Sequence, residues 1–195
     1  MDHYTIAIVL WDGVEELDFA GPYEVLTAWS RMSERPISVR TVGPSGDVVR
    51  CSHDLKVVPD TSWDDLGDID LLVLPGGDTR PLQADEAFLE RMRERAQAGT
   101  LMTSVCTGAL VYAKAGLLAD RPATTHWSAL EALGELGTDV RVDPDARFVD
   151  DGEIVTAAGV SAGIDMTLHL IARLDSVERA RELRRYIQYD PAPPV

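Results

Sequence analysis

A chain of 195 residues with 45% hydrophobic content is large enough to build one α/β domain around its own core, without disulfide or metal support. Its 33 acidic and 18 basic residues give a formal net charge of −15, which repels nucleic-acid phosphates and anionic lipid headgroups. No stretch reaches the roughly 20 apolar residues that span a bilayer. We therefore expect neither nucleic acid nor membrane as a partner.

The cysteine content and the start of the chain predict a cytoplasmic location. Residues Met1 to Tyr4 lead directly into a strand-like run, without the basic and apolar regions of a secretory signal. Only Cys51 and Cys106 occur, and neither has neighbours at metal-ligand spacing, so no metal is expected. Two reduced thiols fit a cytoplasmic protein better than a disulfide framework does.

Strand and helix patterns alternate along the chain. Apolar β-rich runs predict strands at residues 4–10, 37–42, 48–49, 55–58, 69–74, 100–105, 147–149 and 154–156. Helical periodicity predicts helices at residues 18–30, 86–98, 107–115 and 160–174, and a last helix that starts at a capping box in residues 175–178. This alternation predicts a mainly parallel sheet covered by helices on both faces, in a single domain over residues 1–195.

The junction of the predicted strand 100–105 and the helix after it carries Cys106. A sharp strand-to-helix turn crowds the backbone two residues either side of its apex, and Ser104 and Gly108 at those positions are both small. A thiol on such a nucleophile elbow faces the N-terminus of the helix, which favours the thiolate and lowers the thiol pKa. The alternative is that Cys106 is a small buried core residue.

The motifs around this cysteine resemble those of the ThiJ/PfpI superfamily, which is class I glutamine amidotransferase-like. The motifs occur in order along nearly the whole chain, at residues 17–22, 74–77, 104–118, 123–127, 159–165 and 189–194. Within the superfamily they look most like the isonitrile hydratases and the amidotransferase-like sensor domains of AraC-type regulators. The resemblance implies a flavodoxin-like sandwich, usually homodimeric, with no cofactor.

By this resemblance, Asp18 reaches the thiol of Cys106 as the acid and base of the reaction, and Thr107 positions a water. Burial beside the thiol would raise the carboxyl pKa and let Asp18 carry a proton at neutral pH. The other interpretation of Asp18 is a helix N-cap. Gly76 and Gly77 follow a buried strand, where the Gly77 and Thr107 N–H groups would stabilise developing negative charge, although a Gly-Gly pair can also be a plain turn.

Two further residues have open roles. His126 is either a partner for the thiol or a structural hydrogen-bonding residue at a helix start. Gly159 permits close helix packing or forms a wall of the substrate pocket. The superfamily's proteases carry a histidine directly after the cysteine, where this chain has Thr107, so peptidase activity is not expected. The chain also departs from the glycine-rich hydratase pattern at residues 78–80, which bears on pocket shape.

These residues predict an isonitrile hydratase that acts on a small-molecule substrate. The thiolate of Cys106 would attack the isonitrile carbon, Asp18 would supply a proton, and water would release an N-substituted formamide. Two alternatives use the same motifs: a stand-alone ligand-sensing domain, and a glyoxalase or deglycase that acts on small aldehydes.

Overall fold

The structure is a computed structural model that describes residues 2–136 and 139–191. Its centre is a seven-stranded sheet of order β10-β11-β7-β6-β1-β2-β5, in which only β10 runs antiparallel to its neighbour. The strands of this sheet are β1 (Tyr4–Val9), β2 (Ile37–Gly43), β5 (Thr61–Ser62), β6 (Leu71–Leu74), β7 (Leu101–Val105), β10 (Phe148–Asp150) and β11 (Ile154–Ala157). Two small ribbons accompany it, β3 (Val49–Arg50) with β4 (Lys56–Val57), and β8 (Pro122–Ala123) with β9 (Arg141–Val142).

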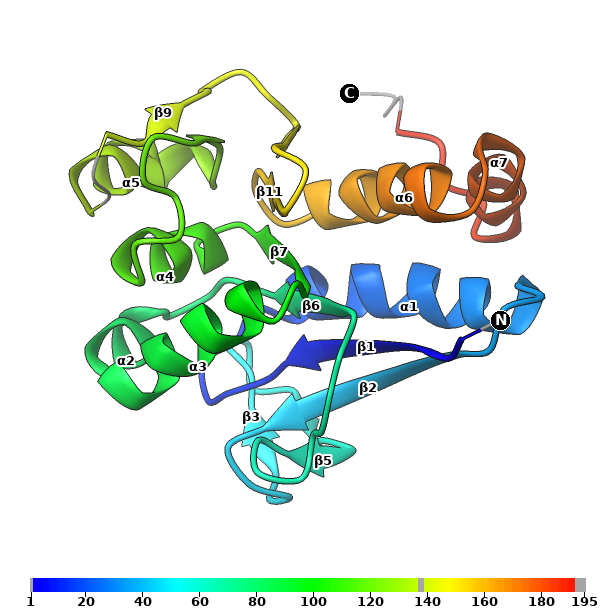
Figure 1. Cartoon of the computed structure of the whole chain (residues 1–195), viewed down its shortest axis with the longest axis horizontal. Helices are drawn as coiled ribbons and strands as arrows, with labels where there is room; N and C mark the ends of the chain where they lie inside the picture. Colours follow the sequence, from blue (N-terminus) through cyan, green and yellow to red (C-terminus); the bar gives the residue numbers. More distant parts are fainter. Residues whose placement is uncertain (1, 137–138, 192–195) are drawn as a thin grey trace.

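Helices flank the sheet in two groups (Figure 1). One group packs α1 against α6 and α7, and the other packs α2, α3, α4 and α5 together. The helices are α1 (Glu16–Met32), α2 (Arg80–Ala84), α3 (Glu86–Gln97), α4 (Gly108–Lys114), α5 (Leu130–Leu136), α6 (Ala162–Leu174) and α7 (Val177–Tyr186), with a short 3₁₀ turn at Trp127–Ala129. This confirms the predicted flavodoxin-like class with a mainly parallel sheet.

The central strands are buried along their whole length, as continuous apolar runs in a parallel sheet should be. Every residue of β6 and of β7 is buried. Their parallel register pairs Leu74 with Ser104, and β11 pairs Ala157 with Val105. The loops that follow these three strands therefore leave the sheet at one edge, where ligands bind in open α/β folds.

Two helix starts differ from the sequence predictions. Helix α1 begins at Glu16, so Asp18 lies in its first turn and is not its N-cap. Helix α7 begins after Ser176, whose hydroxyl accepts a hydrogen bond from the Arg179 N–H at 3.1 Å. A simple serine cap thus replaces the predicted capping box. The sequence analysis did not predict α2, α5, β5, β8 or β9. The last residues of the proline motif, 192–194, lie outside the described residues.

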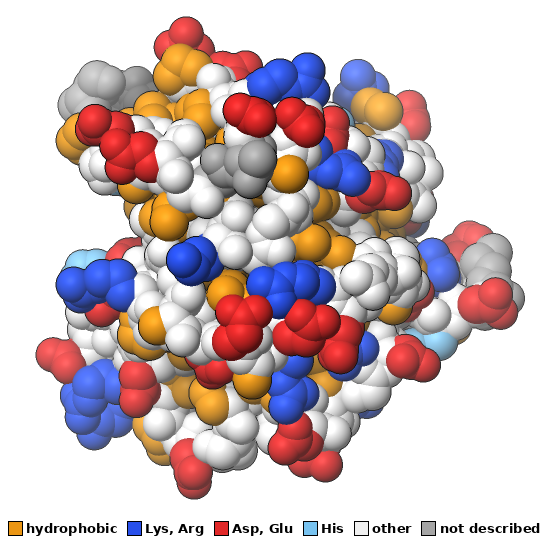
Figure 2. Space-filling view, turned by 60° about the vertical axis from the view of Figure 1, so that its left-hand side comes forward, with side chains coloured by type: hydrophobic (Ala, Val, Ile, Leu, Met, Phe, Trp, Pro, Cys, Tyr) orange, Lys and Arg blue, Asp and Glu red, His pale blue; other side chains and the backbone are white. Residues whose placement is uncertain are grey.

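Within residues 2–136 and 139–191, no helix combines the length and apolar character that crossing a membrane requires. Figure 2 shows acidic and basic side chains intermixed over one face of the molecule, with apolar side chains between them. Many of the charges are paired, as in the Arg93 interactions with Glu86 and Glu90. Surface pairs of this kind contribute little to stability and leave the helix faces solvated.

Candidate active site

Cys106 occupies a strained turn between β7 and α4. Its φ of 56° lies in the left-handed region that non-glycine residues rarely adopt. Such outliers cluster at functional sites, because the surrounding structure must hold them in place. The Cys106 N–H is held by the carbonyls of Ala157 and Ala158 at 3.1 and 3.0 Å. A side chain at position 108 would overlap the Leu74 carbonyl, so the small Gly108 is required as the elbow pattern predicted.

Asp18 reaches this turn from the first turn of α1 and is completely buried. Its Oδ2 accepts the Gly76 N–H at 2.8 Å, while Oδ1 has no hydrogen-bond partner among the described residues. Burial raises the pKa of the Asp18 carboxyl to about 7, against the opposing effect of the Gly76 hydrogen bond, and the Glu15 charge raises it further. The nearby Cys106 thiol lowers this pKa slightly. Asp18 can therefore gain or lose a proton near neutral pH.

The thiol of Cys106 does not have the lowered pKa that the sequence predicted. Burial and the Asp18 charge raise the thiol pKa to about 12. The backbone N–H groups of Thr107 and Val160 and the Thr107 hydroxyl act to lower the thiol pKa, but they do not compensate for burial. The helix start alone thus does not produce a thiolate, and a base that accepts the thiol proton is needed.

The hydroxyl of Thr107 binds the loop after β6. It accepts the Gly77 N–H at 3.0 Å and donates to the Gly77 carbonyl at 2.9 Å. Gly77 has a φ of 117°, and a side chain on it would overlap the Gly13 carbonyl. A Cβ on Gly76 would lie 2.6 Å from the Thr107 nitrogen. The N–H groups of Gly76 and Gly77 are thus bound within the protein, and the predicted role of the Gly77 N–H in stabilising negative charge would require it to leave Thr107. The N–H groups that lower the thiol pKa belong to Thr107 and Val160.

His126 and Gly159 contact each other at the side of the turn. A Cβ on Gly159 would overlap the His126 ring, so only glycine fits there with the ring in its present position. His126 caps the 3₁₀ turn, where its Nδ1 lies 2.8 Å from the Ser128 hydroxyl and accepts the Ser128 N–H at 3.3 Å. This is the structural role left open by the sequence. No described hydrogen bond joins His126 to Cys106.

The structure brings in two residues that the sequence analysis did not assign. Val160 has a φ of 47°, in the left-handed region, and its backbone N–H acts to lower the pKa of the Cys106 thiol. Thr125 donates its hydroxyl to the Cys106 carbonyl at 2.6 Å. Only the family motifs at residues 123–127 and 159–165 indicated these positions, because a valine or a threonine carries no signal for such roles by itself.

The segment that departs from the hydratase pattern, residues 78–80, makes its side-chain ion pair within itself. Arg80 forms a two-pronged ion pair with Asp78, at 2.7 and 2.8 Å, and Thr79 is buried. Helix α2 begins at Arg80, directly after Thr79, with Pro81 in its first turn. The side chains of Asp78 and Arg80 thus contact each other within the loop, and Arg80 is exposed to solvent.

One described cluster has metal-ligand spacing: ligand atoms of Glu15, Glu16 and His53 lie within 4.8 Å of one another. His53 Nδ1 lies 2.8 Å from Glu16 Oε2, and this contact raises the pKa of His53. Burial acts to raise the pKa of Glu16, but hydrogen bonds from His53 and Ser52 lower it to about 2. The three side chains of this cluster thus pair with one another, His53 with the two carboxylates. The second cysteine, Cys51, is buried nearby with a pKa raised to about 11 by burial.

Comparisons with known proteins connect this geometry to known activities. A sequence profile described as the DJ-1/PfpI family matches residues 4–173. The chain is 37% identical over 190 residues to an isonitrile hydratase of Pseudomonas putida, covering 97% of this chain and 80% of that protein. It is 28% identical over 180 residues to the HTH-type transcriptional regulator GbdR of Pseudomonas aeruginosa, covering 92% of this chain. The chain spans only 48% of that regulator.

Solved structures agree with these sequence matches. A ThiJ/PfpI family protein from Pseudomonas syringae superposes with a TM-score of 0.89 at 32% identity, covering 100% of this chain and 78% of that one. An AraC family transcriptional regulator from Pseudomonas putida superposes with a TM-score of 0.83 at 24% identity, covering 94% and 99%. The second match supports the fold alone.

Proposed function

Because the chain belongs to the DJ-1/PfpI family, we propose that it is an isonitrile hydratase that converts an isonitrile and water to an N-substituted formamide. Membership in this family confirms the resemblance predicted from the motifs. The observation that carries the proposal is the buried carboxyl of Asp18 beside the Cys106 thiol, with a pKa of about 7. A 37% identical relative that is an isonitrile hydratase supports the choice of reaction.

The first half of the reaction uses the thiol and the carboxylate. Asp18 accepts the thiol proton, and the sulfur of Cys106 bonds to the terminal carbon of R–N≡C. The carbon then takes the proton back from Asp18, which gives a thioimidate, R–N=CH–S. The N–H groups of Thr107 and Val160 stabilise the transient thiolate, since both lower the pKa of the thiol. A carboxyl pKa near 7 suits both proton transfers at neutral pH.

The second half adds water and releases the product. Asp18 takes a proton from water as the water oxygen bonds to the thioimidate carbon, and passes this proton to the nitrogen. The hydroxyl of the resulting adduct then gives its proton to Asp18, the C–S bond breaks as the carbonyl forms, the sulfur takes the proton from Asp18, and R–NH–CHO leaves. The Thr107 hydroxyl, which is held by its two bonds to Gly77 and lowers the pKa of the Cys106 thiol, positions this water. The backbone of Gly76 holds Asp18 in place, and the backbone of Gly77 holds Thr107. Gly159 and His126, which contact each other, form one side of the substrate site.

No cofactor takes part in this scheme. We further propose that the protein works in the cytoplasm, as one domain and as a homodimer. Exposed apolar side chains on α1 and directly beside the strands β3 and β4, namely Leu17, Tyr23, Val48, Leu55 and Val58, are the surface for a second copy. The ribbon lies on α1, because His53 bonds Glu16. A mass corresponding to one chain in light scattering would contradict the dimer.

Ligand sensing is the second candidate function, since the chain is 28% identical to the regulator GbdR over 180 aligned residues. The regulator has a further half that the alignment does not cover, so the match concerns one part of it. A sensor would bind a ligand at the elbow and release it unchanged. Aldehyde chemistry is a third reading of the same thiol, and it predicts lactate from methylglyoxal.

The decisive experiment follows formamide from one aryl and one alkyl isonitrile by chromatography. The wild type and Cys51→Ala should turn over, whereas Cys106→Ala and Asp18→Asn should lose at least about 100-fold in kcat/KM. Cys51→Ala is the matched control, because it removes the other buried thiol. Full turnover by Cys106→Ala would refute the mechanism. No turnover by the wild type would favour sensing, or aldehyde chemistry if lactate forms from methylglyoxal.

A further inference from the structure

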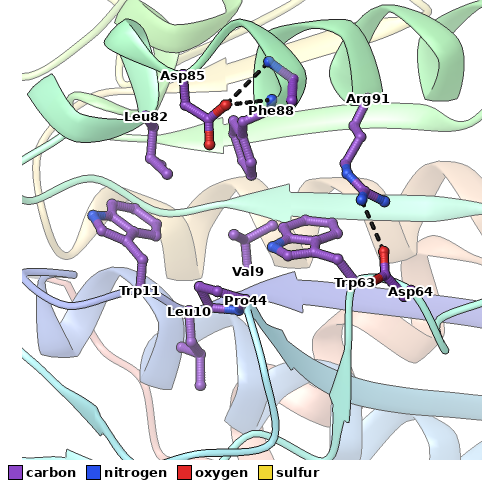
Figure 3. Close-up of a pocket in the computed structure, with 11 residues that line it drawn as sticks. Val9, Leu10, Trp11, Pro44, Trp63, Asp64, Leu82, Asp85, Phe88 and Arg91 are labelled. Atoms are coloured by element: carbon purple, nitrogen blue, oxygen red, sulfur yellow. Dashed lines mark hydrogen bonds and ion pairs between the residues drawn. The ribbon is translucent and has the colours of Figure 1, made fainter.

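A cavity lies away from the elbow, beyond the carboxyl ends of β1 and β5 and beneath α2 and α3 (Figure 3). Its volume is about 200 Å³, and none of Cys106, Asp18 and Thr107 lines it. An engineered apolar cavity of about 150 Å³ is large enough to bind benzene. The space therefore suits a compact ligand of a few heavy atoms.

Three aromatic rings form much of its wall: Trp11, Trp63 and Phe88. The indole N–H of Trp11 donates to the Asp78 carbonyl at 3.1 Å, which fixes the orientation of that ring. The rings of Trp63 and Phe88 meet edge to face, with centroids 5.3 Å apart. Aromatic faces carry partial negative charge and attract cations, tryptophan most strongly.

The charged groups at the rim leave a surplus of negative charge. Arg91 Nη2 binds Asp64 Oδ1 at 2.8 Å, so these two charges compensate each other. Asp85 caps α3 with one carboxylate oxygen, Oδ1, which accepts the N–H groups of Ala87 and Phe88. Its other oxygen points down toward the cavity in Figure 3. Because the Asp85 carboxylate already occupies the start of α3 and accepts two of its N–H groups, an anion there would meet a like charge.

From the aromatic walls and the Asp85 carboxylate, which forms no ion pair with a described side chain, we infer that this cavity binds a small organic cation with a methylated or quaternary ammonium head. The methyl groups would fill the apolar space, while the positive charge would face the indole rings and the Asp85 carboxylate. A plain ammonium ion is a worse fit, since it is strongly hydrated and would need several acceptors. This inference does not depend on the proposed isonitrile chemistry.

The test titrates the full-length protein with choline and with 3,3-dimethylbutan-1-ol, its uncharged carbon isostere, by calorimetry. Choline should bind at least about 10-fold more tightly than the alcohol, the difference expected for a cation on desolvated aromatic faces. Equal affinities would overturn the cation assignment and identify an apolar ligand site. Absence of choline binding up to 50 mM (on the order of the weakest useful affinity) would overturn the proposal as a whole.

Two variants locate the binding. Asp85→Asn keeps a good helix cap but removes the charge, and Trp63→Leu keeps apolar volume but removes the aromatic face. Each should weaken choline binding about 5-fold or more, with unchanged circular dichroism. Trp127→Leu is the control, because Trp127 is 77% exposed and does not line the cavity. If Trp127→Leu weakens binding as much as Trp63→Leu does, the assignment to this cavity is wrong.

Discussion

The hydroxyl of Thr107 bonds both backbone groups of Gly77, as acceptor from its N–H at 3.0 Å and as donor to its carbonyl at 2.9 Å. This pair of bonds joins the loop after β6 to the start of α4, across the edge of the sheet where Cys106 lies. Gly76, next in the chain, holds the carboxylate of Asp18. One side chain thus fixes the spacing between the loop, the carboxylate and the thiol.

Replacing Thr107 by valine should destabilise the fold by about 1–3 kcal/mol, since the half-buried Gly77 N–H and carbonyl would both lose their partner. Thr107→Ser keeps the hydroxyl and should cost well under half as much. Urea denaturation of the three proteins measures the difference. Equal losses in the valine and serine variants would show that the methyl group, and not the hydroxyl, supports the loop.

The reactivity of Cys106 should follow the ionisation of Asp18. Below pH 7 both groups hold protons, and loss of one proton leaves a carboxylate that can take the thiol proton. Alkylation by iodoacetamide should therefore rise through a midpoint near pH 7 and then level off, in a Cys51→Ala background that removes the other thiol. In Asp18→Asn this midpoint should disappear. A midpoint near pH 7 that survives in the asparagine variant would assign it to another group.

Much of this site could be predicted from the sequence, because the elbow imposes local steric requirements. Small residues at 104 and 108 around a cysteine mark the turn, and the φ of 56° at Cys106 agrees with it. The predicted lowering of the Cys106 thiol pKa was wrong, because burial raises this pKa. Burial depends on which residues pack over the sulfur, and no local sequence pattern indicates them. Asp18 was placed by resemblance, and its N-cap interpretation failed because α1 starts two residues earlier.

The parts of the fold that were not predicted are short. Strands β5, β8 and β9 have two residues each, too few for an alternating pattern. The equally short β3 and β4 were predicted because a Gly-Pro turn signal precedes them and apolar valines and leucines lie beside them. Helix α2 has five residues and starts at Arg80-Pro81, in a segment that reads as a loop. By contrast, α3 was predicted to within a residue, because its apolar positions Phe88, Leu89 and Met92 share one face.

Asp18→Asn should stabilise the protein at alkaline pH. The Asp18 pKa is raised from 3.8 to about 7 on folding, so the folded chain holds this proton more tightly than the unfolded chain does. The resulting stabilisation is complete below pH 4 and is lost as the pH rises through 7. Asparagine never ionises and can still accept the Gly76 N–H. Relative to wild type, the variant should therefore gain on the order of 3 kcal/mol between pH 4 and pH 8.

Urea unfolding at both pH values measures this gain, with Glu24→Gln as the control for removal of an exposed carboxylate from the same helix. The control should show no comparable change with pH. A constant difference between Asp18→Asn and wild type across the range would mean that the Asp18 pKa is the same in the folded and unfolded chains.

Two helical glycines should respond in opposite ways to alanine. A Cβ at Gly108, in α4, would overlap the carbonyl of Leu74, which belongs to β6 and cannot move without disturbing the sheet. At Gly134, in α5, the nearest atom would be Val142 Cγ2 at 3.8 Å, an ordinary contact. Gly134→Ala should therefore stabilise by about 0.5–1 kcal/mol through helix propensity alone. Gly108→Ala should destabilise by roughly 2 kcal/mol or more, despite the same gain in propensity.

Thermal and urea unfolding of the two variants separate the effects, since propensity is common to both and the steric overlap is confined to Gly108. The overlap also displaces α4 from the end of β6, so Gly108→Ala should change the alkylation rate of Cys106, whereas Gly134→Ala should leave it as in wild type. If Gly108→Ala is as stable as Gly134→Ala, α4 does not approach Leu74 as closely as described, and the turn at Cys106 is less constrained than its φ implies.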